Sequence, residues 1–228
     1  MNHATQAFWD EVYRGRDRSW RDNPHPYLLK ALARATPGQA LELGCGEGTT
    51  AVWLAAQGWT VTAVDVSPVA LDSAAERAER AGVSSRISWR RADLCDWTTQ
   101  ETFDLVTALF LHTPLELQTP GLLARAAAQT RTGGTLLTVG HYTLPPGAWN
   151  TDATDDLLSA SELVTALGVH EPDWRTVLAE EVPRTVMDRD GHPSTVLDAV
   201  LHAVRVPPRG RMTGRSEPSG SSLVHKTE

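Results

Sequence analysis

A glycine-rich segment, ELGCGEG at residues 42–48, is the densest candidate for ligand binding in the sequence. Because glycine has no side chain, a run of glycines lets a ligand approach the main chain closely. The segment follows a strand-like run and precedes a helix-like run, where backbone N–H groups and the helix dipole face a ligand. Its candidate cofactor contacts are Glu42, Gly44, Cys45, Gly46, Glu47 and Gly48.

The spacing of these glycines indicates which nucleotide is expected. A dinucleotide fingerprint reads G-x-G-x-x-G, but counted from Gly44 the third glycine comes one place early, at Gly48, and Thr49 occupies the fingerprint position. This spacing disfavours NAD. A nucleoside ligand without a pyrophosphate needs the same close backbone approach and binds at the carboxyl ends of the first strands of a doubly wound sheet.

Two aspartates downstream of the glycines have the chemistry to anchor a nucleoside. Asp65 ends a β-branched run, twenty-one residues after Gly44, where a carboxylate can accept hydrogen bonds from ribose hydroxyls. Asp93 follows the next strand-like run, suitably placed for an adenine amino group. Taken singly, a solvated strand end for Asp65 and a turn-forming role for Asp93 remain open.

Two histidines are candidates for acid–base chemistry. His112 follows the strand-like run 103–111, and His141 lies near the end of the run 135–142. Both positions are carboxyl ends of expected strands, so the two side chains should share the ligand-facing edge. A structural histidine that bonds a loop carbonyl is the alternative for each.

Short strand-like and helix-like runs alternate from about residue 40 to about 205. This order predicts an α/β fold with a single Rossmann-like, doubly wound and mainly parallel sheet that carries an antiparallel C-terminal strand. Strands are expected at 40–43, 59–66, 86–90, 103–111, 135–142, 174–182 and 194–206, with the last two antiparallel to one another. Helices are expected at 49–57, 67–82, 119–134 and 159–168.

Composition limits the function classes. The chain has 228 residues, 41% of them hydrophobic, which suits one buried domain, and its net charge of −7 argues against nucleic acid or an anionic membrane as partner. No run reaches the roughly 20 apolar residues that span a bilayer, and the first residues lack a secretory signal, so we expect a cytoplasmic protein. The two cysteines, Cys45 and Cys95, provide neither a disulfide framework nor a thiolate metal site, and no metal is expected.

Three parts of the chain are expected. Residues 1–39 form an N-terminal helical lid segment in which Trp9 and Trp20 close over the cofactor, or alternatively a helix packed on the sheet edge. Residues 40–206 form the catalytic domain. Residues 207–228, rich in Pro, Gly, Ser and Arg, are expected to be a disordered tail.

Four motifs in this order resemble those of the class I S-adenosylmethionine-dependent methyltransferases: ELGCGEG, AVDVSPVAL, RADL and FDLV. The resemblance covers roughly residues 8–206. Within that family, the chain is similar to the tellurite-resistance and thiopurine methyltransferase-like branch, through FWDEVYRGRDRSWRDNPHPYL, FLHTP and GHY.

The resemblance implies S-adenosylmethionine as the cofactor, with the glycine loop at its methionine moiety. Asp65, followed by Val66, would contact the ribose, and Asp93 with the Leu94 backbone the adenine. Glu42 would order the loop from behind. Cys45 is expected to be a small filler between glycines, whereas Glu47 either shields the positive charge of the cofactor or caps the following helix.

The expected reaction is methylation of a small molecule, and the narrower resemblance implies a thiol, a selenol or a tellurium oxyanion as the acceptor. Methyl transfer needs a nucleophile aligned in a dry pocket, with a base to deprotonate a thiol or hydroxyl, for which His112 is the first candidate and His141 the second. Methylation of an oxygen, nitrogen or carbon atom of a secondary metabolite is an alternative. A cofactor-binding sensor without catalysis is another.

Overall fold

The computed structural model describes residues 3–15, 23–111, 119–144, 157–187 and 192–207 of the chain. The elements in these ranges, in chain order, are α1 (His3–Arg14), α2 (Pro26–Leu32), β1 (Gln39–Leu43), α3 (Thr49–Ala56), β2 (Thr60–Asp65), α4 (Pro68–Arg80), the 3-10 turn η1 (Ser84–Arg86), β3 (Ile87–Arg91), β4 (Phe103–Leu109), α5 (Thr119–Ala128), β5 (Thr130–His141), α6 (Ala160–Leu167), β6 (Trp174–Met187) and β7 (Pro193–Arg205).

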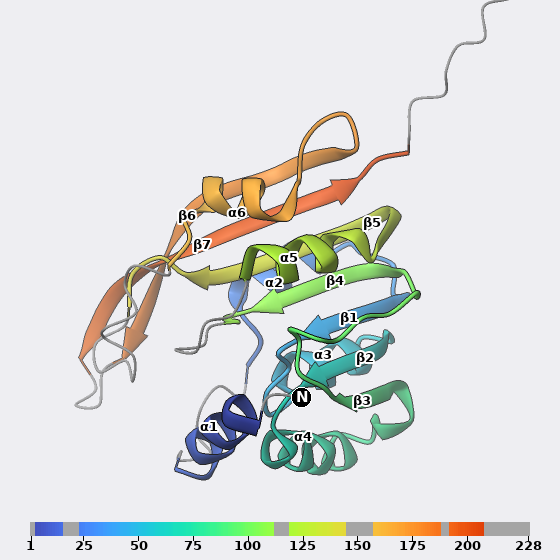
Figure 1. Ribbon diagram of the computed structural model, residues 1–228, viewed down its shortest axis with the longest axis vertical. Helices are drawn as coiled ribbons and strands as arrows, with labels where there is room; N and C mark the ends of the chain where they lie inside the picture. The colour runs from blue at the N-terminus through green and yellow to red at the C-terminus, as the bar shows by residue number, and fades with distance from the viewer. Residues whose placement is uncertain (1–2, 16–22, 112–118, 145–156, 188–191, 208–228) are drawn as a thin grey trace, which may run out of the picture.

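Seven strands of the described chain form one sheet in the order β3-β2-β1-β4-β5-β7-β6. Strands β1 to β5 pair in parallel, whereas β7 is antiparallel both to β5 and to β6. The carboxyl ends of the parallel strands point to the left in Figure 1, toward α1. The predicted fold class, a mainly parallel Rossmann-like sheet with an antiparallel C-terminal strand, is confirmed.

Helices α4 and α6 begin and end where their sequence signals predict. The Ser67 hydroxyl accepts a hydrogen bond from Ala70 N at the start of α4, and Pro68 follows at the first helical position. At α6, Ser159 and Glu162 form a reciprocal capping box, and Gly168 ends the helix in the left-handed conformation at φ 65°.

Two hydrophobic cores, one on each face of the sheet, make the fold doubly wound. On one face, Leu122 and Leu123 of α5 and Leu163 of α6 pack with buried strand residues such as Val106 and Leu136. The other face is covered by α2, α3 and α4, whose packed residues include Leu28, Leu32, Ala51, Leu54, Leu71 and Ala78. The sheet is therefore buried on both faces, and ligands can reach it at its ends.

Three predicted boundaries were wrong. The helix expected over 119–134 ends at Ala128, and β5 begins at Thr130 rather than at residue 135. Thr130 pairs with Phe103 and Thr135 with Leu105, so β5 carries three extra residues between these pairs, and Gly133 in this bulge has φ 81°. Strand β6 also runs past residue 182, to Met187, and forms a long hairpin with β7.

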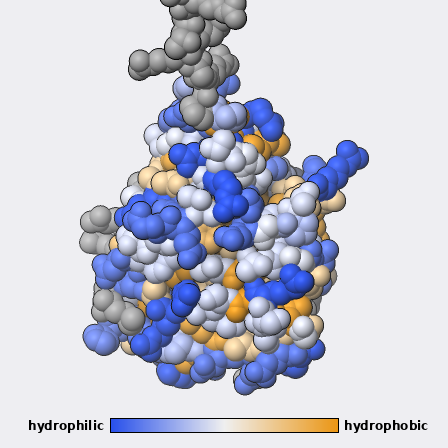
Figure 2. All heavy atoms as spheres, turned by 90° about the vertical axis from the view of Figure 1, so that its right-hand side faces the viewer, coloured by the Kyte–Doolittle hydropathy of each residue, from blue (hydrophilic) through white to orange (hydrophobic). Residues whose placement is uncertain are grey.

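The two ends of the parallel strands differ in their surroundings. At the amino-terminal end, which Figure 2 views, hydrophilic side chains predominate and the hydrophobic ones form small separate groups. Helix α1 lies at the other end, beside α4 (Figure 1). Within the described ranges, no helix is both long and apolar enough to cross a bilayer. The predicted tail lies outside the described residues, apart from Pro207.

Candidate functional site

A cavity lies at the carboxyl ends of β1, β2 and β3, enclosing about 510 Å³ of space that is partly open to solvent. Five residues predicted to bind a cofactor line it: Gly44, Asp65, Val66, Asp93 and Leu94. They come from three successive turns after parallel strands, which end at the same edge of the sheet. The structure therefore brings these predicted residues together.

The glycine loop is held in place by the end of β2. The N–H groups of Gly44 and Cys45 both donate to Val64 O, at 2.8 and 3.1 Å. One carboxylate oxygen of Asp65 accepts from Gly46 N at 2.8 Å, and the other accepts from Ser67 N at 2.9 Å. Asp65 thus organises the loop, and its carboxylate also lines the cavity.

The environment of Asp65 is buried and largely built from main-chain donors. Burial raises the pKa of Asp65, whereas the backbone N–H groups of Ser67, Gly46 and Val66 act in the opposite direction. The carboxylate of Asp10, on α1, raises the pKa further.

Gly48 and Glu42 support the loop from behind rather than lining the cavity. A Cβ at Gly48, whose φ is 75°, would lie 2.7 Å from Ala74 Cβ and 2.8 Å from Trp89 Cη2, so packing requires glycine at this position. Glu42 is buried and bonds the Thr50 side chain and the Ala51 backbone at the start of α3. Its Oε2 atom has no hydrogen-bond partner among the described residues.

The burial of Glu42 and Cys45 affects their ionisation. Burial raises the pKa of Glu42 to about 8, partly offset by the hydrogen bond from Thr50 and reinforced by the charge of Asp65. Burial also raises the pKa of the Cys45 thiol well above its ordinary value, which suits a packing residue and not a nucleophile. Glu47 is half-buried in the turn before α3 and is not among the residues that line the cavity.

Asp93 both forms a turn and faces the cavity. Its Oδ1 accepts from Cys95 N at 3.0 Å, and its carbonyl accepts from Trp97 N at 2.9 Å. Asp93 is nevertheless one of the residues that line the cavity, together with Leu94. The two interpretations of Asp93 that the sequence left open are therefore compatible.

Helix α1 forms one wall of the cavity. Thr5, Trp9 and Tyr13 line it from this helix, and a Cβ at Gly46 would lie 2.8 Å from Tyr13 Oη. The buried Asp10 carboxylate accepts a hydrogen bond from the Ser67 hydroxyl at 2.5 Å, which ties α1 to the start of α4. Trp20 and His112, predicted as a cofactor contact and as a base, lie outside the described residues.

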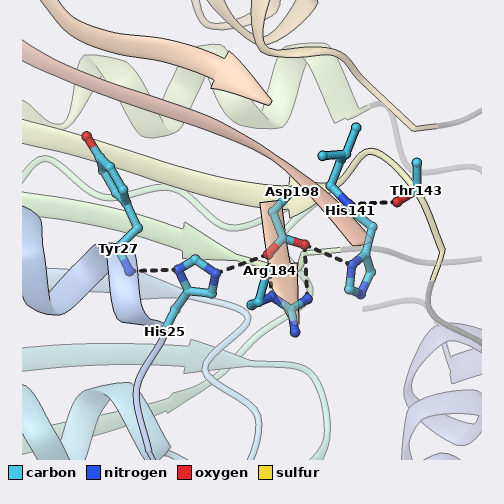
Figure 3. Close-up of polar contacts among 7 residues, drawn as sticks. His25, Tyr27, His141, Thr143, Arg184 and Asp198 are labelled. Atoms are coloured by element: carbon cyan, nitrogen blue, oxygen red, sulfur yellow. Dashed lines mark hydrogen bonds and ion pairs between the residues drawn. The ribbon is translucent and has the colours of Figure 1, made fainter. Parts of the chain in front are cut away.

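The remaining predicted residue, His141, belongs to a buried polar cluster. We call this group, formed by His25, His141, Arg184 and Asp198, the Asp198 cluster (Figure 3). Arg184 donates from Nε and Nη2 to the two oxygens of Asp198, the second at 3.0 Å. His25 Nε2 lies 3.1 Å from Asp198 Oδ2, and His141 Nδ1 lies 3.4 Å from Oδ1.

Asp198 stays ionised in this cluster although it is buried. Burial alone would raise the pKa of Asp198, but hydrogen bonds from His141, His25 and Arg184 hold that pKa far below its usual range. Within the described ranges, no group of three or more His, Cys, Asp or Glu side chains is arranged to hold a metal ion.

Phe110, directly after β4, connects the Asp198 cluster to the cavity. Its ring centroid lies 4.6 Å from that of His141 and 5.6 Å from that of His25, and the Arg184 guanidinium carbon lies 5.3 Å from the ring centre. Phe110 also lines the cavity, and its φ of 55° is in the left-handed region, which is costly for a bulky side chain.

Sequence reasoning missed most of the Asp198 cluster and part of the cavity lining. Residues Thr5, His25, Phe110, Leu111, Arg184 and Asp198 were not predicted as site residues. The signal for Asp198 was present as a charged residue in an otherwise apolar strand, TVLDAVL, where a buried carboxylate needs partners. The partners themselves lie far away in sequence, with His25 separated from Asp198 by 173 positions.

Comparison with known proteins finds a family match for part of the chain. Residues 40–134 match the family described as "Methyltransferase domain". The ribosomal RNA small subunit methyltransferase C of Alcanivorax borkumensis is 34% identical over 147 residues, which cover 62% of this chain and 45% of that protein. The chain therefore spans less than half the length of this relative.

Solved structures share the fold. The N-methyltransferase NodS from Bradyrhizobium japonicum, in complex with S-adenosylhomocysteine, matches with a TM-score of 0.63 at 24% identity, over 90% of this chain and 100% of that one. TehB from Haemophilus influenzae matches with a TM-score of 0.66 at 20% identity, over 89% of this chain and 67% of that one. At these identities the likeness concerns the fold alone, and the tellurite-resistance branch stays a prediction. Residues 40–134 match a methyltransferase domain, the chain shares the fold of solved methyltransferases, and S-adenosylmethionine is the cofactor of such a domain.

Proposed function

We propose that the protein transfers a methyl group from S-adenosylmethionine to a small molecule. The observation that carries this proposal is a single cavity at the strand ends, which joins two carboxylates and a glycine loop to the Asp198 cluster through Phe110. One side of the cavity suits a nucleoside, and the other side is lined by Phe110, whose ring packs against the ionisable side chains of the Asp198 cluster. The reaction needs both compounds in one enclosed space.

The residues that line the cavity fit the groups of the cofactor. Carboxylate oxygens of Asp65 and Asp93 suit ribose hydroxyls and an adenine amino group, and the bare backbone at Gly44 suits the methionine part. The aromatic rings of Trp9 and Tyr13 have faces that attract a cation. The cofactor supplies a methyl group already activated on a sulfonium, so the work of the protein is alignment and exclusion of water.

Helix α1 has the position of a lid in this proposal. It covers the cavity with Thr5, Trp9 and Tyr13, and the Asp10–Ser67 hydrogen bond holds it against α4. A concave site between α1 and the strand ends suits a metabolite better than a macromolecule. The net charge of −7 also disfavours a nucleic acid, although one relative methylates ribosomal RNA.

Two measurements test the proposal. Labelled S-adenosylmethionine is incubated with the full chain and a panel of thiols, phenols, selenite and tellurite, and methylated products are counted. We expect turnover on at least one member, and tight cofactor binding without product on any of them would instead favour a sensor.

The cofactor assignment is tested separately by calorimetry. We expect Asp65→Asn to weaken S-adenosylmethionine binding by roughly 1 to 3 kcal/mol, because the amide is a poorer acceptor for ribose hydroxyls. Asp104→Asn, at an exposed carboxylate on β4, is the control and should leave affinity unchanged. Equal affinities for all three proteins would refute the ribose assignment.

A further inference from the structure

Three hydrogen bonds from Arg184 and His25 reach the Asp198 carboxylate, and His141 Nδ1 faces it as a fourth nitrogen. An ionised carboxylate only accepts hydrogen bonds, with two lone pairs on each oxygen. Oδ2 receives Arg184 Nε and His25 Nε2, while Oδ1 receives Arg184 Nη2 at 3.0 Å and faces His141 Nδ1 at 3.4 Å. Each imidazole nitrogen that faces the carboxylate must therefore carry a hydrogen.

His25 has both of its ring nitrogens committed within the fold. Its Nδ1 accepts from Tyr27 N at 3.2 Å, so the ring hydrogen is on Nε2, which points to Asp198 (Figure 3). The residue is buried and caps the start of α2. His25 is thus a neutral support for the carboxylate, and its nitrogens cannot take a proton from a ligand without breaking one of these bonds.

His141 lies on the opposite side of Asp198 from His25 (Figure 3) and has the other tautomer. With the hydrogen on Nδ1, the basic lone pair is on Nε2. Because Arg184 already balances the charge of Asp198, the carboxylate needs from His141 only a hydrogen bond, which a neutral imidazole donates. Asp198 on β7 faces His141 directly, whereas Arg184 on β6 and His25 before α2 contact the same carboxylate and the same Phe110 ring.

His141 also has the right location. It is the last residue of β5, its side chain is 12% exposed, and its ring packs at 4.6 Å against Phe110, which lines the cavity. A base at this point is next to the cavity but outside the group of residues assigned to the nucleoside.

We propose that Asp198 is a positioning residue that holds His141 as the base of the reaction, and that the methyl acceptor is a compound whose nucleophilic oxygen or sulfur carries a proton. This inference rests on the proposed methyl transfer. An acceptor such as tellurite, which is already an anion, would need no base.

In this reaction the proton moves to His141 and the methyl group moves to the acceptor. His141 Nε2 takes the proton of the acceptor O–H or S–H, and the electron pair left on oxygen or sulfur forms the bond to the methyl carbon. The carbon–sulfur bond of the sulfonium breaks with its electrons returning to sulfur. The resulting imidazolium, which still donates from Nδ1 to Asp198, then releases its proton to water.

The decisive variant is His141→Asn. Asparagine places its amide nitrogen near the position of Nδ1, so it retains a donor toward Asp198 but lacks the basic nitrogen. On acceptors that are un-ionised at the assay pH, we expect kcat to fall by about 10² to 10⁴. On acidic thiols that are already ionised, the loss should be less than about tenfold. The acidic limb of the pH–rate profile should disappear in the variant.

His202→Asn is the matched control, because His202 is another buried histidine on the same sheet, outside both the cavity and the Asp198 cluster. This variant should change kcat by less than about threefold and should leave the pH–rate profile unchanged. Asp198→Asn should lower kcat in the same acceptor-dependent manner, by about 10 to 100-fold.

The outcomes separate this inference from the proposed function. Absence of any turnover by the wild type would contradict the methyltransferase itself. If the wild type turns over but His141→Asn lowers kcat equally on ionised and un-ionised acceptors, or does not lower it, only the role of His141 is overturned. A readout that needs no acceptor is the tautomer of His141 in nitrogen-15 NMR spectra of the full chain, where hydrogen on Nε2 instead of Nδ1 would also overturn it.

Discussion

The cofactor side of the cavity and the neighbouring Asp198 cluster, which we compare as two sides of the site, are built by different means. At the cofactor side, main-chain N–H groups of Gly46 and Ser67 hold Asp65, and all the predicted contacts except Trp20 lie between residues 42 and 94. At the Asp198 cluster, side chains hold one another, and they come from four separate segments. Both sides lie at the same edge of one sheet.

The two sides are therefore sensitive to different substitutions. A site made of backbone depends on the turn that shapes it, so glycine conformation and close packing decide its integrity. A site made of buried charged side chains depends on complete pairing, because one missing partner leaves another charge uncompensated. The two sides should therefore respond differently to substitution and to pH.

The largest expected effect is at the Asp198 cluster. Asp198→Ala leaves the Arg184 guanidinium without its carboxylate and two histidines without an acceptor, so we expect the free energy of unfolding to fall by about 3 to 5 kcal/mol. Urea denaturation measures this. Asp104→Ala removes a half-exposed partner of Arg131, 2.8 Å away, together with the acceptor of Gln39 N, and should cost about 1 to 2 kcal/mol. Similar losses in both variants would mean that the cluster is not a tightly coupled network.

The next effect distinguishes the two sides by the sign of their pH dependence. Glu42 has its pKa raised to about 8 in the folded chain, so the stability it contributes is present below its unfolded pKa of 4.5 and is lost as pH rises toward 8. Glu42→Gln should therefore gain stability relative to the wild type, by roughly 4 kcal/mol between pH 4.5 and 8.5. Unfolding free energies measured at both pH values test this.

Asp198 provides the opposite case for the same measurement. Its folded pKa is lowered, so its contribution is present above the unfolded pKa and is lost as pH falls into the acid range. Asp198→Asn should therefore lose most stability near neutral pH and least in acid. If Glu42→Gln and Asp198→Asn shifted the pH dependence in the same direction, the contrast between the two sides would fail.

A smaller effect tests the backbone side directly. Gly48→Ala would force alanine into a left-handed conformation, at φ 75°, and would place its Cβ 2.7 Å from Ala74 Cβ. We expect both effects together to lower the free energy of unfolding by about 2 to 3 kcal/mol. Gly168→Ala has a similar φ of 65° but meets nothing within 4 Å, so it should cost about 1 kcal/mol. Equal costs would show that conformation, and not packing against α4 and β3, accounts for the glycine.

The smallest effect concerns the wall that α1 contributes. Asp10→Asn weakens the hydrogen bond from Ser67 to α1, worth about 1 kcal/mol, so cofactor release should become roughly fivefold faster. Stopped-flow tryptophan fluorescence measures the rate through Trp9 in the cavity wall. Glu11→Gln removes the same charge from an exposed position of α1 and should leave the rate unchanged. An equal acceleration by both variants would point to net charge instead of the hydrogen bond.

The same difference explains what the sequence could predict. Gly44, Asp65 and Asp93 were predictable because each follows a short strand, and parallel strands end at one edge. Ser67 and Gly168 marked helix ends through local hydrogen bonds. By contrast, the contact of Arg184 with Asp198 depends on the register of the β6–β7 hairpin, in which Arg184 lies opposite Val196.

Other parts of the site were out of reach for related physical reasons. The role of Gly48 depends on Ala74 and Trp89, which reach it only in the folded chain, so its glycine was attributed to a ligand contact. The early start of β5 was missed because Thr130 pairs with Phe103 before a three-residue bulge interrupts the strand. His112 and Trp20 lie outside the described residues, so their roles stay predictions.

The β6–β7 hairpin has a consequence for how such a protein can change. Arg184 and Asp198 belong to it, and both lie beyond residues 40–134, the stretch that matches the methyltransferase domain. Mutation of the hairpin can therefore remodel the neighbourhood of the acceptor while the nucleoside berth stays intact. On the proposed assignment, new substrate preferences can arise by substitutions in the β6–β7 hairpin, without changes to the residues that bind the methyl donor.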